Sequence, residues 1–207
     1  MSILTCQIGQ CGNQLGQAFY DKMASELCNA DTWHLTAGFS SHFSFSDWAD
    51  KKTGKGKSKD TFLSPEENSK KSYQESIPRA NSVLIDMEPK VINSLLNRPG
   101  NLWAYDKNLA FCQQEGSGNN WAYGHYEHGP KCSEPMLEKF RILLERQDLV
   151  DGILFLQSLA GGTGSGIGSY LMNLLKDEYP ELNLFTTVVL PRFSGEVILQ
   201  FYNCVFS

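Results

Sequence analysis

The stretch Ala160-Gly-Gly-Thr-Gly-Ser-Gly-Ile-Gly168 decides the predicted fold. It follows a nearly unbroken apolar run at 152–159 and precedes a helical pattern, so it predicts a turn from a buried strand into a helix. Positions 161–168 hold five glycines and two hydroxyl residues. Glycines let successive backbone N–H groups face one anion, and the helix N-terminus adds about half a positive charge. We predict a phosphate-binding loop; the alternative is a glycine turn made only for tight packing.

Its spacing differs from the two common phosphate motifs. The P-loop pattern G-x-x-x-x-G-K-[ST] would need a glycine at position 51, which is lysine. The dinucleotide pattern G-x-G-x-x-G fails whether it starts at Gly162 or at Gly164. The missing fingerprint argues against the alternative of a nucleotide-dependent oxidoreductase.

Strand-like and helix-like runs alternate on both sides of this loop. This alternation predicts an α/β fold with a doubly wound, mainly parallel sheet and helices on both faces. We expect Ser133 to cap one helix, 182–190 to form another buried strand, and a last helix to begin near Gly195. The other predicted strands are 3–8, 83–87, 109–112 and 152–159.

Residues 29–72 interrupt the alternation and are rich in Ser, Lys, Asp and Gly. We interpret them as a polar insertion, partly disordered, within one domain that spans 1–207. The net charge of −5 argues against duplex nucleic acid as the main partner, although 51–59 hold five lysines. No apolar run approaches the length of a membrane span, and the six cysteines are expected to be reduced thiols in an intracellular protein.

Three more turns follow predicted strands: 9–16, 86–89 and 116–121. Ligands of open parallel sheets bind at such strand ends, so the turns are expected to meet at one site. Asp86 and Glu88 would repel a phosphate unless a hard cation lay between them. The alternative is that one of these carboxylates merely caps the next helix.

Four sequences in this order resemble the nucleotide loops of the tubulin superfamily: GQCGNQLG at 9–16, DMEP at 86–89, GSGNNWAYGH at 116–125 and AGGTGSG at 160–166. The resemblance covers nearly all of the chain outside 29–72. The delta subfamily is favoured by three features: the sequence at 83–92, Ala160, and the stretch at 195–198.

The resemblance implies GTP and Mg²⁺ as cofactors and assigns no catalytic residue. It assigns the metal to Gln10 and, through water, to Glu88. The 117–119 turn would meet the terminal phosphates, and 161–164 the alpha and beta phosphates. The base and ribose would lie beside Ser158 and Glu196. The full set of implied nucleotide contacts is Gln10, Cys11, Ser117, Gly118, Asn119, Ser158, Gly161, Gly162, Thr163, Gly164 and Glu196.

The resemblance also implies a cytoskeletal protein of the cytoplasm, with other tubulins or centriolar microtubule components as partners, acting at centrioles, basal bodies and cilia. Tubulins continue beyond the position of Ser207 with base-reading residues, a central helix and a loop whose acid acts on the neighbouring subunit's nucleotide. We therefore expect this chain to bind GTP weakly and not to hydrolyse it. The alternative is an interaction fragment that binds no nucleotide.

Overall fold

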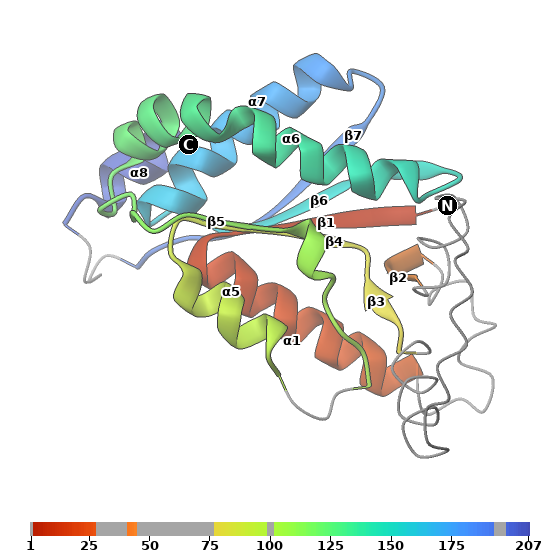
Figure 1. Ribbon diagram of the computed structural model, residues 1–207. Helices are drawn as coiled ribbons and strands as arrows, with labels where there is room; N and C mark the ends of the chain where they lie inside the picture. The colour runs from red at the N-terminus through yellow and green to blue at the C-terminus, as the bar shows by residue number, and fades with distance from the viewer. Residues whose placement is uncertain (1, 28–40, 45–76, 99–101, 193–197) are drawn as a thin grey trace, which may run out of the picture.

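The computed structural model describes residues 2–27, 41–44, 77–98, 102–192 and 198–207 (Figure 1). Most of the predicted insertion at 29–72 lies outside these ranges, as do Gly195 and the predicted ribose contact Glu196. The predictions that fall there stay predictions.

A five-stranded sheet forms the centre of the molecule, in the order β5-β4-β1-β6-β7. Every neighbouring pair is parallel, and Thr5 of the central strand lies between Ser82 and Leu154. The predicted α/β class is confirmed. The strands are β1 (Ser2–Ile8), β4 (Ser82–Asp86), β5 (Ala110–Cys112), β6 (Val150–Ser158) and β7 (Asn183–Val189).

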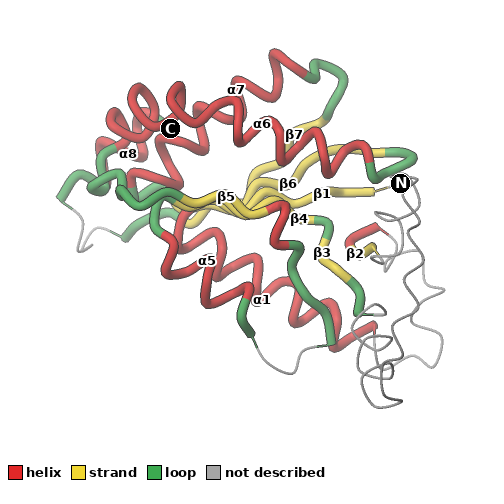
Figure 2. The backbone as a smooth tube through the Cα atoms, in the orientation of Figure 1, coloured by secondary structure: helices red, strands yellow, loops and turns green. Residues whose placement is uncertain are grey.

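Helices cover both faces of the sheet, which makes the fold doubly wound. In Figures 1 and 2, α1 and α5 lie on one side and α6, α7 and α8 on the other. Pro89 begins α5, where its missing N–H costs no hydrogen bond. The helices are α1 (Gly9–Leu27), α5 (Pro89–Leu96), α6 (Gly129–Glu145), α7 (Gly168–Glu178) and α8 (Gln200–Phe206).

Alternate side chains of the strands pack into two separate hydrophobic cores, one on each face of the sheet. Leu4, Cys6 and Ile8 of β1 join the cluster beneath α6 and α7, as the two-residue period of a strand requires. The second cluster lies on the α1 side and includes Tyr20 and Phe43. A short antiparallel pair, β2 (Phe43–Ser44) and β3 (Arg79–Ala80), closes this second core.

The buried position of Phe43 corrects part of the prediction for residues 29–72. Its side chain is 3% exposed and meets the Tyr20 ring edge to face at 5.3 Å. Phe43 therefore belongs to the core, although the sequence around it shows no apolar period that could have revealed this.

Two further predictions are also corrected: the burial of β7 and the capping role of Ser133. No residue of β7 is buried, and Phe185 is 48% exposed; β7 is the last strand in the order of the described sheet. Ser133 lies inside α6, which begins four residues earlier at Gly129, and its hydroxyl donates to the Pro130 carbonyl. The last helix in the described part of the chain, α8, spans Gln200–Phe206, while the predicted helix start near Gly195 lies outside the described residues.

Two buried glutamines on neighbouring central strands each lie against a glycine of a helix. Gln7 of β1 donates to the Ser82 hydroxyl at 2.9 Å and accepts from the Tyr105 hydroxyl at 3.1 Å. A Cβ atom at Gly16 of α1 would overlap the Gln7 amide. In the same way, a Cβ at Gly168 of α7 would overlap the amide of Gln157 in β6. The two helices can lie this close to the sheet because these positions carry no side chain.

Candidate nucleotide-binding cleft

The carboxyl ends of β1, β4 and β6 meet at one edge of the sheet, where a cleft of about 330 Å³ opens. This is the edge at which open parallel sheets bind ligands. All four predicted turns contribute to it. The lining residues are Ile8, Gly9, Gln10, Cys11, Gln14, Asp86, Glu88, Val91, Asn119, Ser158, Gly161, Gly162, Thr163 and Gly164.

The structure brings most of the predicted site residues together in this cleft. Ser117 lies just behind the lining, buried, with its hydroxyl 3.3 Å from that of Thr163. Gly118 is exposed and is not among the lining residues, and Glu196 lies outside the described part of the chain. The predicted residues that line the cleft are Gln10, Cys11, Glu88, Asn119, Ser158, Gly161, Gly162, Thr163 and Gly164.

Sequence reasoning missed two side chains that line the cleft. Gln14 follows Gln10 by four residues, so helical spacing alone would have placed both on the same face of α1. Val91 of α5 carries no polar group that could have drawn attention to it.

The turn at 117–120 requires two left-handed residues. Gly118 has a φ of +56° and Asn119 a φ of +54°, and the Asn120 N–H donates to the Ser117 carbonyl at 3.0 Å. Consecutive positive φ values closed by this bond define a type I′ turn, which glycine and asparagine tolerate best. The turn exposes Gly118 and leaves Asn119 to line the cleft.

Glycines of the 160–168 loop serve two different purposes. A Cβ at Gly162 would lie 2.6 Å from the Asn120 nitrogen, and one at Gly166 would lie 2.5 Å from the Trp121 oxygen. These glycines allow two loop backbones to touch. A Cβ at Gly161, in contrast, would meet one described atom within 4 Å, the Asn119 Oδ1 at 3.6 Å. Tight packing, the alternative considered for the loop, thus explains part of it, while Gly161 leaves open space in the cleft.

Both loops enter their helices through a π-helical turn. These turns are η4 (Thr163–Ile167), before α7, and η3 (Tyr123–His128), before α6. The closest approach is between glycines, since a Cβ at Gly124 would overlap the Gly162 carbonyl. Such turns are frequent at functional sites, where they re-aim the backbone without ending the helix.

A buried carboxylate gives the cleft its electrostatic character. Asp86 is 4% exposed, and its Oδ1 accepts from the backbone N–H groups of Met87 at 2.8 Å and Glu88 at 3.4 Å. Its Oδ2 is buried without a hydrogen-bond partner. Burial, aided by the nearby Glu88 carboxylate, raises the pKa of Asp86 to about 6 against the lowering effect of the two N–H donors.

These carboxylates fit a hard cation better than a capping role. Glu88 occupies the N-cap of α5 without a side-chain capping bond, so its carboxylate is available to the cleft. The unpartnered Asp86 oxygen is the kind of atom that Mg²⁺ or its water shell satisfies. Within the described ranges no three His, Cys, Asp or Glu residues gather into a metal site. A cation here would take further oxygens from a phosphate ligand, as Mg²⁺ commonly does.

The thiol in the cleft is suited to an anionic neighbour. Burial raises the pKa of Cys11, although a hydrogen bond with Ser158 lowers it in part. The thiol therefore stays neutral at physiological pH and does not repel a phosphate.

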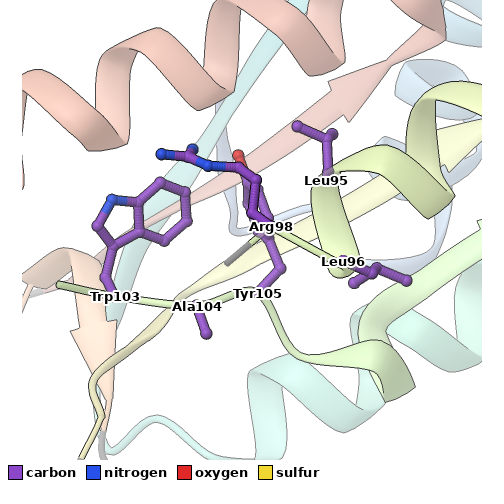
Figure 3. Close-up of a pocket in the computed structure, with 6 residues that line it drawn as sticks. All are labelled: Leu95, Leu96, Arg98, Trp103, Ala104 and Tyr105. Atoms are coloured by element: carbon purple, nitrogen blue, oxygen red, sulfur yellow. The ribbon is translucent and has the colours of Figure 1, made fainter. Parts of the chain in front are cut away.

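A second, much smaller cavity of about 30 Å³ lies beside the second core, with room for about one water molecule (Figure 3). Arg98 extends along its edge, 5.6 Å from the centre of the Trp103 ring, and pairs with Asp21 at 2.8 Å. Trp103 Nε1 donates to the same Asp21 oxygen at 3.1 Å. These contacts hold the 103–105 segment against α1, so the residues around the cavity serve packing rather than ligand binding.

Comparison with known proteins identifies the family. The profile of the "Tubulin/FtsZ family, GTPase domain" matches residues 2–207. The chain belongs to the Tubulin/FtsZ family. The predicted membership in the tubulin superfamily is thereby confirmed, and the cleft lies at the strand ends of its GTPase domain.

Similar tubulins include delta and epsilon chains. The human tubulin delta chain is 37% identical over 209 residues, which cover all of this chain and 42% of the human protein. The mouse tubulin delta chain is 36% identical over the same length. The mouse tubulin epsilon chain is 34% identical over 201 residues, which are 97% of this chain and 40% of the mouse protein. The chain thus spans about two fifths of the length of these relatives.

Of the helices that the structure describes, none combines the length and apolar character required to cross a membrane.

Proposed function

We propose that the cleft binds GTP together with Mg²⁺, and that the chain acts as a delta-type tubulin in the organisation of centriolar, basal-body and ciliary microtubules. The observation that carries the nucleotide part is the buried, unpartnered oxygen of Asp86 in a cleft otherwise lined by glycine turns. Phosphates would supply the negative charge that such turns attract, and a cation would satisfy the carboxylate.

Each side of the cleft would hold a different part of the ligand. The backbone N–H groups of 161–164 would hold two phosphates, while Ser117 and Asn119 would meet the terminal phosphate. Gln10 and Glu88 would hold the metal through its water shell, with Asp86 behind them. Mg²⁺, when bound, would neutralise the charge of the terminal phosphates. Cys11 would lie against the nucleotide and Ser158 beside the base or ribose, with Glu196 as a contact of the ribose hydroxyls.

Partners and location follow from the family relationship. The chain resembles delta and epsilon tubulin chains along nearly its whole length. Other tubulins are therefore the proposed partners, and the centriole, basal body and cilium the proposed sites of action within the cytoplasm. Localisation of a tagged chain by fluorescence microscopy tests this part, and a diffuse signal without enrichment at centrioles would contradict it.

A second function is favoured by the exposed apolar residues of α8 and the segment before it. Ile198 is 92% exposed and Tyr202 66% exposed. Surfaces of this kind often meet a partner. A chain that acts through this surface alone would be an interaction fragment that binds no nucleotide.

Titration of the purified 207-residue chain with a fluorescent GTP analogue distinguishes the two functions. We expect saturable binding with Mg²⁺, a clear loss with EDTA, and displacement by unlabelled GTP. Glu88→Gln should weaken the Mg²⁺ dependence, because the amide cannot replace the carboxylate charge. Glu134→Gln is the matched control, since Glu134 is exposed on α6 and does not line the cleft. A folded chain without saturable binding would leave the interaction fragment as the better proposal.

A further inference from the structure

Asn203 of α8 connects the two loops that line the phosphate side of the cleft. Its side chain is 2% exposed. The Nδ2 group donates to the Asn119 carbonyl at 2.9 Å and to the Ala160 carbonyl at 2.7 Å. The Oδ1 atom accepts from the Trp121 N–H at 2.9 Å. One side chain therefore fixes the main chain of both loops, at Asn119 of the cleft lining and at Ala160 directly before the lining residue Gly161.

An amide is the group that this position requires. Two carbonyls need two donors, and the Trp121 N–H needs an acceptor; an asparagine side chain supplies all three from one planar group. Because the position is buried, each partner left without Asn203 would lose its hydrogen bond away from water. The adjacent Cys204 adds a weaker contact, with its thiol 3.6 Å from the Leu159 carbonyl.

A second connection joins the same loops on the far side of their contact. Trp121 Nε1 donates to the Ser169 hydroxyl at 3.0 Å, and that hydroxyl donates to the Gly166 carbonyl at 3.1 Å. His125 stacks on the Trp121 ring at 4.6 Å and places its Nδ1 3.1 Å from the same hydroxyl. The Trp121 ring also faces Phe206 of α8 at 5.3 Å.

We propose that Asn203 is a positioning residue for the nucleotide: it clamps the 117–121 turn to the 160–164 loop, so that α8 determines how tightly the cleft retains a phosphate ligand. The inference rests on the proposed nucleotide site. Asn119 and Gly161 both border the cleft, and the Asn203 amide holds the carbonyl of Asn119 and the carbonyl directly before Gly161. Without the amide, the two loops would still touch at their glycines but would separate more easily on the cleft side.

The test uses Asn203→Ala in the full 207-residue chain, with Val205→Ala as a control on the same helix at a 79% exposed position. The first readout is hydrogen exchange of the nucleotide-free protein. We expect faster exchange at 117–121 and 160–164 in Asn203→Ala, with exchange in β1 and β6 unchanged. A residue that merely stabilises the fold would accelerate exchange everywhere alike, and that result, or unchanged exchange at the two loops, would overturn the proposal.

The second readout is the dissociation rate of the fluorescent GTP analogue. We expect Asn203→Ala to release it at least about tenfold faster, whereas Val205→Ala matches the unmodified chain. Equal release rates would overturn the inference and leave the proposed function intact. An unmodified chain that does not bind the analogue would refute the proposed function, while the exchange measurement would still decide whether the clamp exists.

A third variant, Asn203→Asp, keeps the test decisive if Asn203→Ala does not fold. Asn203→Asp keeps the volume and the acceptor for the Trp121 N–H but removes both donors and places a charge against two carbonyls. It should loosen the same two loops. Protection of both loops equal to that of the unmodified chain would count against the clamp.

Discussion

Adjacent glycines of the 160–168 loop should respond in opposite ways to the addition of one methyl group. In Gly162→Ala the new Cβ would lie 2.6 Å from the Asn120 nitrogen and 2.9 Å from both the Asn120 oxygen and the Ser117 Cβ. The backbone of the 117–120 turn cannot give way as a flexible side chain would. In Gly161→Ala the nearest described atom is the Asn119 Oδ1 at 3.6 Å, an ordinary contact.

The expected magnitudes follow from these distances. Overpacking at Gly162 should cost about 1–3 kcal/mol of stability. For a domain of about 200 residues this lowers Tm by about 2–4 °C per kcal/mol. Gly161→Ala should change stability by less than about 1 kcal/mol, because its Cβ makes an ordinary contact and alanine restricts the unfolded chain. Its methyl group would instead fill the space that a phosphate needs, and a tenfold loss of GTP affinity corresponds to about 1.4 kcal/mol.

Thermal unfolding and titration with a fluorescent GTP analogue, measured on both variants, check this pair. Gly162→Ala should melt lower than the unmodified chain, whereas Gly161→Ala should melt near it and bind the analogue at least tenfold more weakly. A Gly161→Ala protein that binds as tightly as the unmodified chain would refute the assignment of this residue to the phosphate site. Unchanged melting of Gly162→Ala would refute the packing argument.

Three other perturbations test the electrostatics and the cores. The folded-state pKa of Asp86, about 6, lies above its ordinary value, so stability is greatest when the carboxyl is protonated and falls as pH rises through 6. Asp86→Asn should therefore unfold like the unmodified chain at pH 4 but be more stable by on the order of 2 kcal/mol at pH 7.5 without Mg²⁺; an equal difference at both pH values in urea titrations would contradict this. Phe43→Ala should lower the free energy of unfolding by about 3–5 kcal/mol, because Phe43 is 3% exposed in the second core. A much smaller loss in calorimetry would mean that Phe43 lies at the surface. Tyr20→Phe removes the hydroxyl bonded to Thr5 at 3.0 Å and to the Asn81 carbonyl at 3.3 Å, so denaturant unfolding should show a loss of about 1–2 kcal/mol, and no loss would mean that water replaces the hydroxyl.

The fold class and the meeting of the four turns could be predicted because both depend on local pattern. Apolar runs of strand length separated by helical periods specify a parallel sheet, and the carboxyl ends of parallel strands share one edge. Cleft residues such as Cys11, Glu88 and Ser158 follow from their place at strand ends. Their proposed roles toward a nucleotide come from the family resemblance and remain predictions.

Features that depend on distant partners could not be predicted in this way. The apolar sequence of β7 is compatible with a central or an edge strand, and only the strand order reveals that it lies at the edge. Phe43 belongs to the core through contacts with Tyr20 and Trp103, which are far away in the sequence. A glycine that touches another backbone looks the same in sequence as one that faces a ligand. The different roles of Gly161 and Gly162 can therefore be distinguished only in the structure.

The two buried glutamines bear on how this domain changes over evolutionary time. Gly16 has room for no side chain while Gln7 is present, and Gly168 stands in the same relation to Gln157. A larger residue at either glycine becomes tolerable once the facing glutamine is replaced by a small residue. Enlarging the glycine alone produces a steric clash, and shortening the glutamine alone leaves a cavity. The four positions should therefore be inherited as two linked pairs, and alignments of divergent relatives should show Gln7 varying with Gly16, and Gln157 with Gly168, more often than either glutamine varies alone.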